Sequence, residues 1–234
     1  MPFVISEERA SSVRNMRQPP EPIVGDAVCM TEASGESFRY ALYRRWMRTE
    51  PMILWVVFNP MEGDATINDP AIKRMVTLSW RWGYGGLLVV SLYPLQARSV
   101  DTVVEWRRNN RNTEQWSHFE ESARRAAVLA DEFRCATRVA AWGRLDPDGR
   151  DDLDEWLEHF ESKPPAWCLG VNMLGDPLQP AGRGTAALAT SPLNDPILAP
   201  FEYPVGIAHG PEERQKRIER RAKRIRRTIR PEFA

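Results

Sequence analysis

Residues Met52 to Pro70 read MILWVVFNPMEGDATINDP, and the predicted fold is arranged around this segment. The apolar run Ile53 to Phe58 predicts a strand buried on both faces, because a half-exposed strand would alternate with polar residues. Asn59-Pro60 ends the strand, since proline cannot donate a hydrogen bond to a sheet and favours an extended residue before it. We therefore expect Asn59 at the carboxyl end of a central strand, where open α/β sheets bind their ligands.

A short acidic loop follows this strand and leads into a helix. Residues 61–64 continue as a loop, and Asn68-Asp69-Pro70 is typical of a helix N-cap with proline at the first helical position. The pattern predicts that the Asn59 amide side chain lies at the tip of a strand, next to an acidic loop. As an alternative, Asn59 only caps the turn through its own backbone, a role that asparagine often fills.

Three further strands are predicted for the same sheet. A helix over residues 70–81 and an apolar strand over 87–92 give a β-α-β order, which predicts two parallel neighbours joined by a right-handed crossover. Ser91 is then expected at the same edge as Asn59. Residues 138–143 and 164–170 predict the third and fourth strands, and the loop after the fourth would lie near Asn59.

Arginines alternate with aromatic residues over 38–46, a pattern that predicts an edge or second strand with arginine on one face. Such a strand can stack on bases and touch phosphates, although a core-facing aromatic row is the other reading. Residues 107–112 predict a polar basic loop between helices over 99–106 and 113–134, and an acidic helix follows over 151–161. In that loop Arg108 and Arg111 would contact phosphate, although loops are commonly polar.

The charge balance hides an asymmetry. The 32 basic and 32 acidic residues cancel, but residues 211–230 carry ten basic and three acidic side chains, or +7, against about −7 for the remainder. Such a tail, with Arg220, Arg224 and Arg227, suits an anionic partner and most simply nucleic acid. The alternative is a solvated terminal helix.

The 234 residues, 42% of them apolar, suit one folded α/β domain. The three cysteines and three histidines are scattered, so neither a disulfide framework nor a metal site is expected, and a reducing cytoplasm is the predicted location. No apolar run approaches the length of a membrane span, and no signal peptide is recognised.

Several motifs in order resemble a bacterial and phage family that is catalogued mainly as a domain of unknown function. The resemblance covers about Phe38 to Pro180, with departures from the family pattern at Met61, Ser91 and Gln179. Its motifs in this chain are Asn59-Pro60, Asp69-Pro70, Trp82-Gly83-Tyr84-Gly85-Gly86, Trp142-Gly143 and Cys168-Leu169-Gly170.

The strand followed by Asn-Pro also resembles the first motif of the mismatch-type uracil-DNA glycosylases. That resemblance implies a three-layer α/β sandwich with a central, mainly parallel four-stranded sheet. It implies that Asn59 positions the hydrolytic water, and that Leu178-Gln179-Pro180 forms a second loop that supports the leaving base and penetrates the duplex. Gln179 can donate a hydrogen bond but carries no charge, and Phe58 could stack on an extruded base.

Cleavage of an N-glycosidic bond needs a positioned water, stabilisation of a sugar cation and donors for the departing base. Asp64 and Asp69 are close to Asn59 in sequence, so either carboxylate could assist the water. Each has a structural alternative, because Asp69 could simply cap the helix and Asp64 could be solvated.

The sequence thus predicts an N-terminal extension with one possible strand over 1–35, a glycosylase-like domain over 36–210 and a basic tail over 211–234. The predicted function is a DNA glycosylase that acts on a modified or mismatched base, such as a hypermodified pyrimidine of phage DNA in antiviral defence. Two alternatives are a non-catalytic nucleic-acid-binding module and an enzyme of free nucleotides. No cofactor, metal or membrane partner is expected, and a monomer is assumed. The predicted base pocket contains Phe58, Pro60, Ser91 and Gln179, and the predicted DNA contacts are Leu178, Pro180, Arg183, Arg108, Arg111, Arg220, Arg224 and Arg227.

Overall fold

A computed structural model describes residues 23–32, 35–61, 63–135, 137–160, 166–181 and 199–201. The chain divides into a unit over residues 1–201 and a second unit over residues 202–234. The second unit, with Arg220, Arg224 and Arg227, lies outside the described residues, and so does Arg183. Their predicted contacts with DNA, and the predicted domain division, stay predictions.

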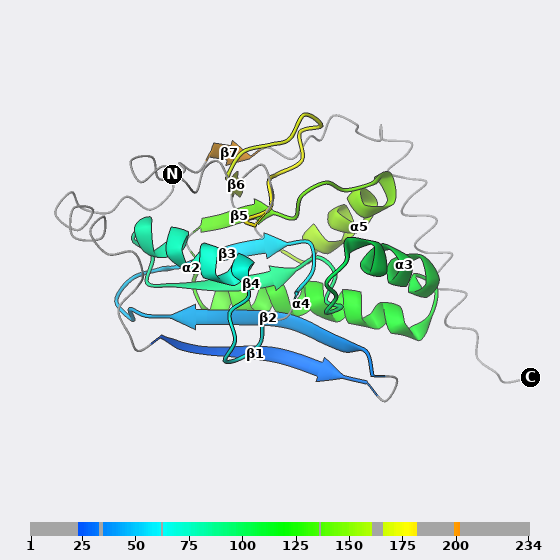
Figure 1. The fold of residues 1–234 in the computed structure, drawn as a ribbon, viewed down its shortest axis with the longest axis horizontal. Helices are drawn as coiled ribbons and strands as arrows, with labels where there is room; N and C mark the ends of the chain where they lie inside the picture. The colour runs from blue at the N-terminus through cyan, green and yellow to red at the C-terminus, as the bar shows by residue number, and fades with distance from the viewer. Residues whose placement is uncertain are drawn as a thin grey trace, which may run out of the picture. The chain divides into compact units, whose positions relative to one another are not determined.

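The described strands form one mixed sheet in the order β1-β2-β4-β3-β5-β6-β7 (Figure 1). Their bounds are β1 Val24–Thr31, β2 Ser37–Arg45, β3 Met52–Val57, β4 Gly86–Ser91, β5 Thr137–Ala141, β6 Ala166–Cys168 and β7 Ala199–Phe201. The strands β4, β3, β5 and β6 pair in parallel, as predicted, whereas β1–β2, β2–β4 and β6–β7 pair antiparallel. The prediction of a four-stranded sheet omitted β1, β2 and β7, which pair antiparallel at the two edges of the parallel strands. The sequence pattern of a strand does not show which sheet edge it joins.

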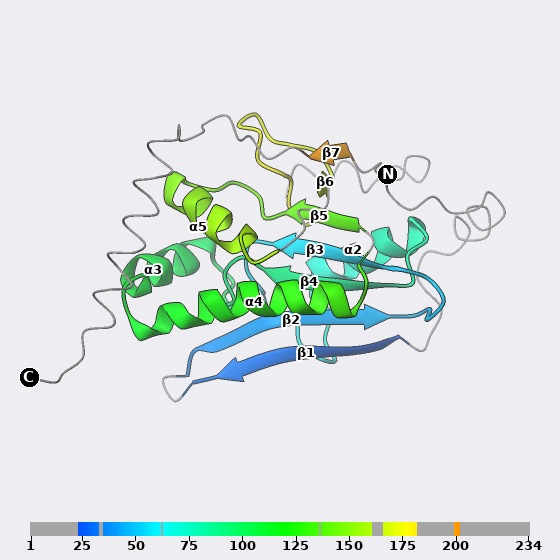
Figure 2. The same cartoon turned by 180° about the vertical axis from the view of Figure 1, so that it is seen from behind.

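Helices lie on both faces of this sheet. They are α2 Pro70–Arg81, α3 Val100–Asn110, α4 Ser117–Glu132 and α5 Pro147–Leu157. Figure 1 shows α2 in front of the sheet, and Figure 2, from behind, shows α4 on the opposite face. In both views α3 and α5 lie toward the carboxyl ends of β3 and β5. The protein is therefore a mixed α/β structure whose carboxyl edge is flanked by two helices.

The strand β3 is central because β4 and β5 both pair with it in parallel, and all six of its residues are buried. Its Trp55 indole donates to Ser79 Oγ at 3.0 Å and stacks on Trp82 with ring centroids 5.7 Å apart. The helix α2 begins as predicted, with Asp69 as the N-cap and Pro70 at its start. The predicted β3-α2-β4 unit is thus confirmed, and it brings Asn59 and Ser91 to the same edge.

Of the two interpretations of β2, the core-facing aromatic row is confirmed, since Phe38, Tyr40 and Leu42 are all buried, whereas the display of Arg39 and Arg44 is wrong. Arg39 and Arg44 are each 3% exposed, because the loop after Asn59 lies over them. Arg39 Nη1 donates to Gly63 O, and Arg44 Nη2 donates to Asp64 O at 2.6 Å. Burial lowers the pKa of Arg39 to about 10. Alternation in the sequence shows which residues share a face, but not whether another segment covers that face.

One further sequence boundary differs from the structure, because residues 107–110 are the last turn of α3 rather than a loop. The possible strand predicted within the N-terminal extension is present as β1, which pairs with β2. In the described part of the chain, no helix is long and apolar enough to cross a bilayer.

Candidate functional site

Asn59 lies two residues beyond β3, and two hydrogen bonds fix its side-chain amide. Its Nδ2 donates to Pro60 O at 2.9 Å and to Ala97 O at 2.8 Å. Both acceptors are carbonyl oxygens, so the nitrogen end of the amide must face them. Oδ1 takes no part in these two bonds, and the residue is partly exposed. The predicted turn-capping role is present in the bond to Pro60, but the amide is also tied to a distant segment.

The chain segments that follow β3 and β4 continue side by side. Leu92 N–H donates to Val57 O and Tyr93 N–H donates to Phe58 O, both at 2.9 Å. Farther on, Ala97 N–H donates to Pro60 O at 3.2 Å. Backbone hydrogen bonds thus fix the residues directly before and after Asn59, so its backbone is held as an extension of the sheet.

Three of the four residues of the predicted base pocket are buried. Phe58 is 5% exposed and Ser91 is 2% exposed, and Pro60 is also buried. The Phe58 ring meets Tyr93 edge to face with centroids 5.1 Å apart. In this arrangement the Phe58 ring packs against Tyr93 instead of being presented to a ligand.

The two predicted carboxylates are both engaged by backbone N–H groups. Asp69 Oδ1 accepts from Ile72 N at 2.9 Å, and its Oδ2 accepts from Gly63 N at 3.3 Å. Asp64 Oδ1 accepts from the N–H groups of Ile67 and Thr66 at 2.7 Å each. These bonds lower the pKa of Asp64. The structural alternative for Asp69, capping of the helix, is confirmed.

The predicted second loop reaches the edge next to Asn59. Gln179 Nε2 donates to Trp142 O at 3.1 Å, just beyond the end of β5, which neighbours β3. Leu178 N–H donates to Gly170 O at 2.9 Å, and its side chain is half-buried, whereas Pro180 is buried. Gln179 thus comes from the segment after β6 and contacts the residue that follows β5, the strand next to β3, which agrees with the predicted place of this loop near Asn59.

Gly143 leaves space for the Gln179 side chain because it has no Cβ. We expect Gly143→Ala to lower the stability of the protein and to displace Gln179. Gly143 has φ +79°, and an added Cβ would lie 2.8 Å from Gln179 Cγ and Nε2. The left-handed backbone and the crowding together predict a loss of about 1–2 kcal/mol of unfolding free energy. Urea denaturation followed by tryptophan fluorescence measures it. The matched variant Gly175→Ala also has positive φ but meets nothing within 4 Å, so an equal loss in both variants would contradict the crowding.

The loop between β6 and Gln179 presents an apolar tip. Met173 is 103% exposed and Leu174 is 57% exposed. The tip is nevertheless held rigidly, because Asn172 Oδ1 accepts from the N–H groups of Leu174 at 2.8 Å and Asp176 at 3.1 Å. Arg150 on α5 binds the buried Asp176 at 3.0 Å. Both views show this yellow segment extending toward the carboxyl side of the sheet (Figures 1 and 2).

A family model described as "Protein of unknown function (DUF1643)" matches residues 39–180. The chain belongs to this family. The match confirms the predicted membership of a family of unknown function, and it includes the β3–β6 strands, Asn59 and Gln179 but not residues 211–234.

Other comparisons give no functional guide to this DUF1643 member. No curated protein matches the chain. Among solved structures it is similar to a chain from a structural study of two fungal esterases from Rhizomucor miehei, with 12% identity and a TM-score of 0.24. The similarity covers 66% of this chain and 60% of the esterase chain, and a TM-score this low does not indicate a shared fold or activity.

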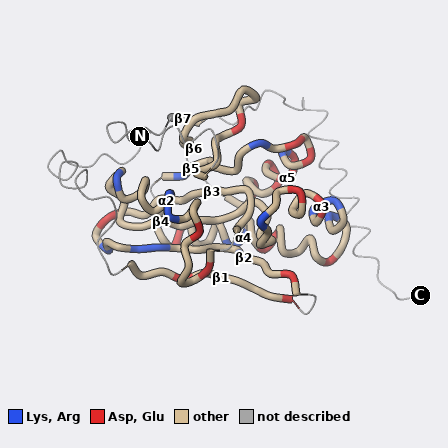
Figure 3. The backbone as a smooth tube through the Cα atoms, in the orientation of Figure 1, with Lys and Arg blue, Asp and Glu red and all other residues tan. Residues whose placement is uncertain are grey.

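Within the DUF1643 segment, a buried polar network lies beside Asn59 and was not predicted. Tyr93 OH donates to Asp152 Oδ2 at 2.6 Å, and Arg111 Nη2 lies 3.1 Å from Asp152 Oδ1. Arg107 donates from both terminal nitrogens to Asp146 at 2.6 Å each. Figure 3 shows basic and acidic segments mingled near α3 and α5. Arg111, predicted to contact DNA, is therefore tied to a buried carboxylate, whereas Arg108 is exposed.

Two features of the sequence could have revealed this network. Asp146-Pro147 repeats the N-cap and proline pattern of Asp69-Pro70, so α5 begins before the predicted 151. Asp152 then falls on the stripe of Gly149, Leu153 and Trp156, whose helical spacing marks the buried face. Burial raises the pKa of Asp152 to about 6.

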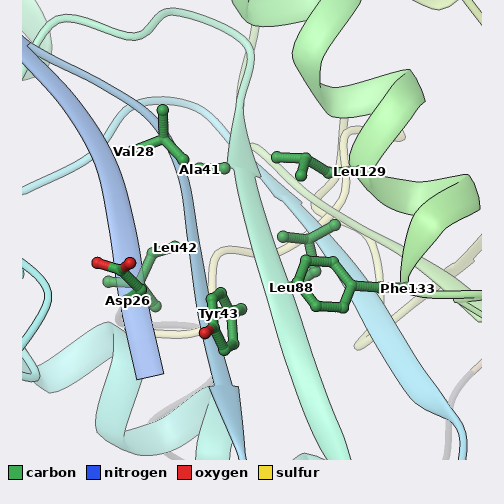
Figure 4. Close-up of a pocket in the computed structure, with 8 residues that line it drawn as sticks. All are labelled: Asp26, Val28, Ala41, Leu42, Tyr43, Leu88, Leu129 and Phe133. Atoms are coloured by element: carbon green, nitrogen blue, oxygen red, sulfur yellow. The ribbon is translucent and has the colours of Figure 1, made fainter. Parts of the chain in front are cut away.

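A small hollow that is open to solvent lies elsewhere, between β1, β2, β4 and the end of α4 (Figure 4). Its lining begins before the DUF1643 match, at Asp26 and Val28, and includes none of the predicted site residues. Across the described residues, His, Cys, Asp and Glu nowhere gather in a group of three or more that could hold a metal ion.

Proposed function

We propose that this protein is a DNA glycosylase that hydrolyses the N-glycosidic bond of a modified or mismatched base and leaves an abasic site. The observation that carries the proposal is the fixed amide of Asn59. Its Nδ2 is used by Pro60 O and Ala97 O, so Oδ1 is left to accept a hydrogen bond from a water molecule. A partly exposed acceptor at the carboxyl end of a central strand is suited to hold the attacking water.

In the proposed reaction, the water oxygen forms a bond to C1′ of the sugar as the bond from C1′ to the base nitrogen breaks. The electron pair of that bond leaves with the base, and the water proton passes to solvent or to the departing base. Asp64 and Asp69 are occupied by backbone N–H groups. The proposal therefore assigns the water to Asn59 alone and places Gln179 toward the leaving base.

The apolar tip of Met173 and Leu174 is proposed to enter the base stack, in place of Leu178. Apolar wedges separate stacked bases, and a tip that is already rigid loses little entropy on insertion. The half-buried Leu178 is less accessible than Met173, which is fully exposed. The substrate proposed for the site is a hypermodified pyrimidine of phage DNA, with a role in antiviral defence.

We expect the double variant Met173→Ser, Leu174→Ser to bind duplex DNA at least about tenfold more weakly, because the burial of even one such apolar side chain is worth about 1.5 kcal/mol or more. Fluorescence anisotropy with a labelled duplex measures the affinity. Val128→Ser, which alters an exposed apolar residue on α4, serves as the control. Equal affinities of all three proteins would remove the tip from the DNA-binding surface.

A second candidate function is a nucleic-acid-binding module without catalysis. It is favoured by the engagement of both predicted carboxylates, Asp64 and Asp69, with the backbone. Such a module would bind DNA through phosphate contacts, with an affinity that falls as salt rises.

The test incubates the purified full chain with duplexes that contain uracil, a mismatch or glucosylated hydroxymethylcytosine, and with the corresponding free nucleosides. Released base is identified by mass spectrometry, and abasic sites are detected as alkali-labile breaks. Release from DNA but not from nucleosides is the predicted result. Salt-sensitive binding without release would favour the binding module, and release from nucleosides alone would indicate an enzyme of free nucleotides.

A further inference from the structure

Tyr93 and Asp152 take no part in the proposed chemistry, yet Tyr93 contacts the residue before Asn59 and Asp152 binds Tyr93. Both are 0% exposed, and the Tyr93 hydroxyl donates to Asp152 Oδ2 at 2.6 Å. Tyr93 makes two contacts with Phe58. Its N–H donates to Phe58 O at 2.9 Å, and the two rings pack edge to face with centroids 5.1 Å apart. Phe58 directly precedes Asn59, so the contact runs from α5 to the candidate water site.

We infer that Tyr93 and Asp152 are positioning residues for Asn59, with Asp152 anchoring Tyr93 and Tyr93 fixing the Phe58–Asn59 backbone. A short hydrogen bond from a hydroxyl to a carboxylate is among the stronger bonds in proteins, and it sets the direction of the Tyr93 ring. The ring in turn limits where Phe58 can lie. The inferred effect on base release rests on the proposed function, but the inferred position of Asn59 does not.

A buried carboxylate is a costly way to hold a tyrosine, since an apolar pair could fill the same volume without desolvating a charge. Charges surround Asp152 on several sides. Arg107 and Arg111 face it from α3 and the residue after this helix, and Arg107 in turn binds Asp146 and Asp148. Tyr93 faces it from the segment after β4, and Glu155 lies near it on α5. Only Tyr93 and Arg111 lie within 3.5 Å of its oxygens among the described partners.

Protonation of Asp152 weakens this anchor. The charged ion pair with Arg111 is lost, and the Tyr93 hydroxyl then faces a neutral carboxyl, which accepts a weaker hydrogen bond. Because burial raises the pKa of Asp152 to about 6, this change falls just below neutral pH. The position of Asn59 is therefore expected to depend on pH through Asp152.

The test follows the side-chain NH₂ signal of Asn59 by NMR in ¹⁵N-labelled full chain between pH 5 and pH 8, with the signal assigned by its loss in Asn59→Ala. In the wild-type protein we expect the signal to shift with a midpoint near the Asp152 pKa of about 6. Asp152→Asn and Tyr93→Phe should each abolish that shift. Tyr84→Phe is the matched control, because it removes another buried hydroxyl bond of 2.6 Å, to Thr137, at the start of β5.

An Asn59 signal that stays constant with pH in the wild type overturns the inference, as does an equal shift in Asp152→Asn. This measurement requires no catalysis, so it decides the inference even if no base is released and the proposed function fails. Where release is observed, Tyr93→Phe is expected to lower kcat about tenfold with KM unchanged, because a displaced water loses alignment with C1′. A change in KM alone would contradict positioning.

Discussion

Replacement of Asn59 by alanine is expected to lower the single-turnover rate of base release by about two to three orders of magnitude, the range for a lost group that acts on the reacting atoms. The substitution removes Oδ1, the proposed acceptor for water, and both Nδ2 bonds. Unfolding free energy should fall by only about 1–2 kcal/mol, because two hydrogen bonds of a partly exposed side chain are lost. DNA affinity should hold, since a water ligand contributes to the rate rather than to binding.

Two further variants sharpen this prediction. Asn59→Asp keeps an oxygen but replaces the amide nitrogen, so its carboxylate faces the carbonyls of Pro60 and Ala97 and loses the fixed orientation. We expect a comparable loss of rate. Asn109→Ala, at an exposed site on α3, should match the wild type. A wild-type rate in Asn59→Ala would remove Asn59 from the chemistry.

The second large effect is expected for Arg107→Met, which should lower the free energy of unfolding by about 2–3 kcal/mol, because charge-assisted hydrogen bonds of a buried guanidinium are lost while their acceptor, Asp146, is 38% exposed. Arg107 is 2% exposed and donates to both oxygens of Asp146 at 2.6 Å. Its Nε also lies 4.0 Å from Asp152, which is fully buried. Loss of the guanidinium leaves two carboxylates with less compensation. Urea denaturation followed by tryptophan fluorescence measures the change.

Arg124→Met provides the matched comparison. Arg124 also donates twice to one carboxylate, Glu121, at 2.8 Å and 2.7 Å, but its side chain is 59% exposed. Its loss should cost less than about 1 kcal/mol. A deficit for Arg107→Met no larger than that for Arg124→Met would contradict the buried network.

The Arg107→Met deficit should also depend on pH. The hydrogen bond from Arg107 lowers the pKa of Asp146, so this bond contributes stability above the ordinary carboxyl pKa and loses it as pH falls through the lowered value. Burial raises the pKa of Asp152 to about 6, so that group instead opposes folding as pH rises from its ordinary pKa through that value. Arg107 also lowers the pKa of Asp152, so its removal raises that pKa further, and the deficit should be smaller at pH 4, where Asp152 is protonated in both proteins, than at pH 7. The contribution of Asp146 is lost only at still lower pH, below its ordinary pKa of 3.8. A deficit that grows on acidification would contradict this assignment of charges.

The parts of the fold that local patterns encode could be predicted from the sequence. The unbroken apolar run of β3, the Asp69-Pro70 start of α2 and the apolar run of β4 specified a parallel unit and placed Asn59 at its carboxyl edge. These elements carry their signals within a few residues, and each is buried on the faces that its pattern indicates.

What could not be predicted depends on contacts between distant segments. The exposure of Arg39 and Arg44 was misjudged because the covering loop comes twenty residues later, and Ala97 has no local feature that marks it as the acceptor for Asn59. Buried charge at Asp152 is equally invisible to composition, since it depends on partners from α3 and from the segment after β4. The capping role of Asp69 was visible only as an alternative, and the backbone N–H bonds of Asp64, for which the alternative was a solvated carboxylate, were not predicted.

The measurement that tests the central claim most directly is the amount of free base released from the modified and mismatched duplexes by wild-type protein and by Asn59→Ala, assayed side by side by mass spectrometry. The proposal predicts that wild-type protein releases one base and leaves an abasic site, and that the variant releases it about two to three orders of magnitude more slowly while DNA binding persists. It is contradicted if neither protein releases a base although both bind DNA, or if the two release it at the same rate.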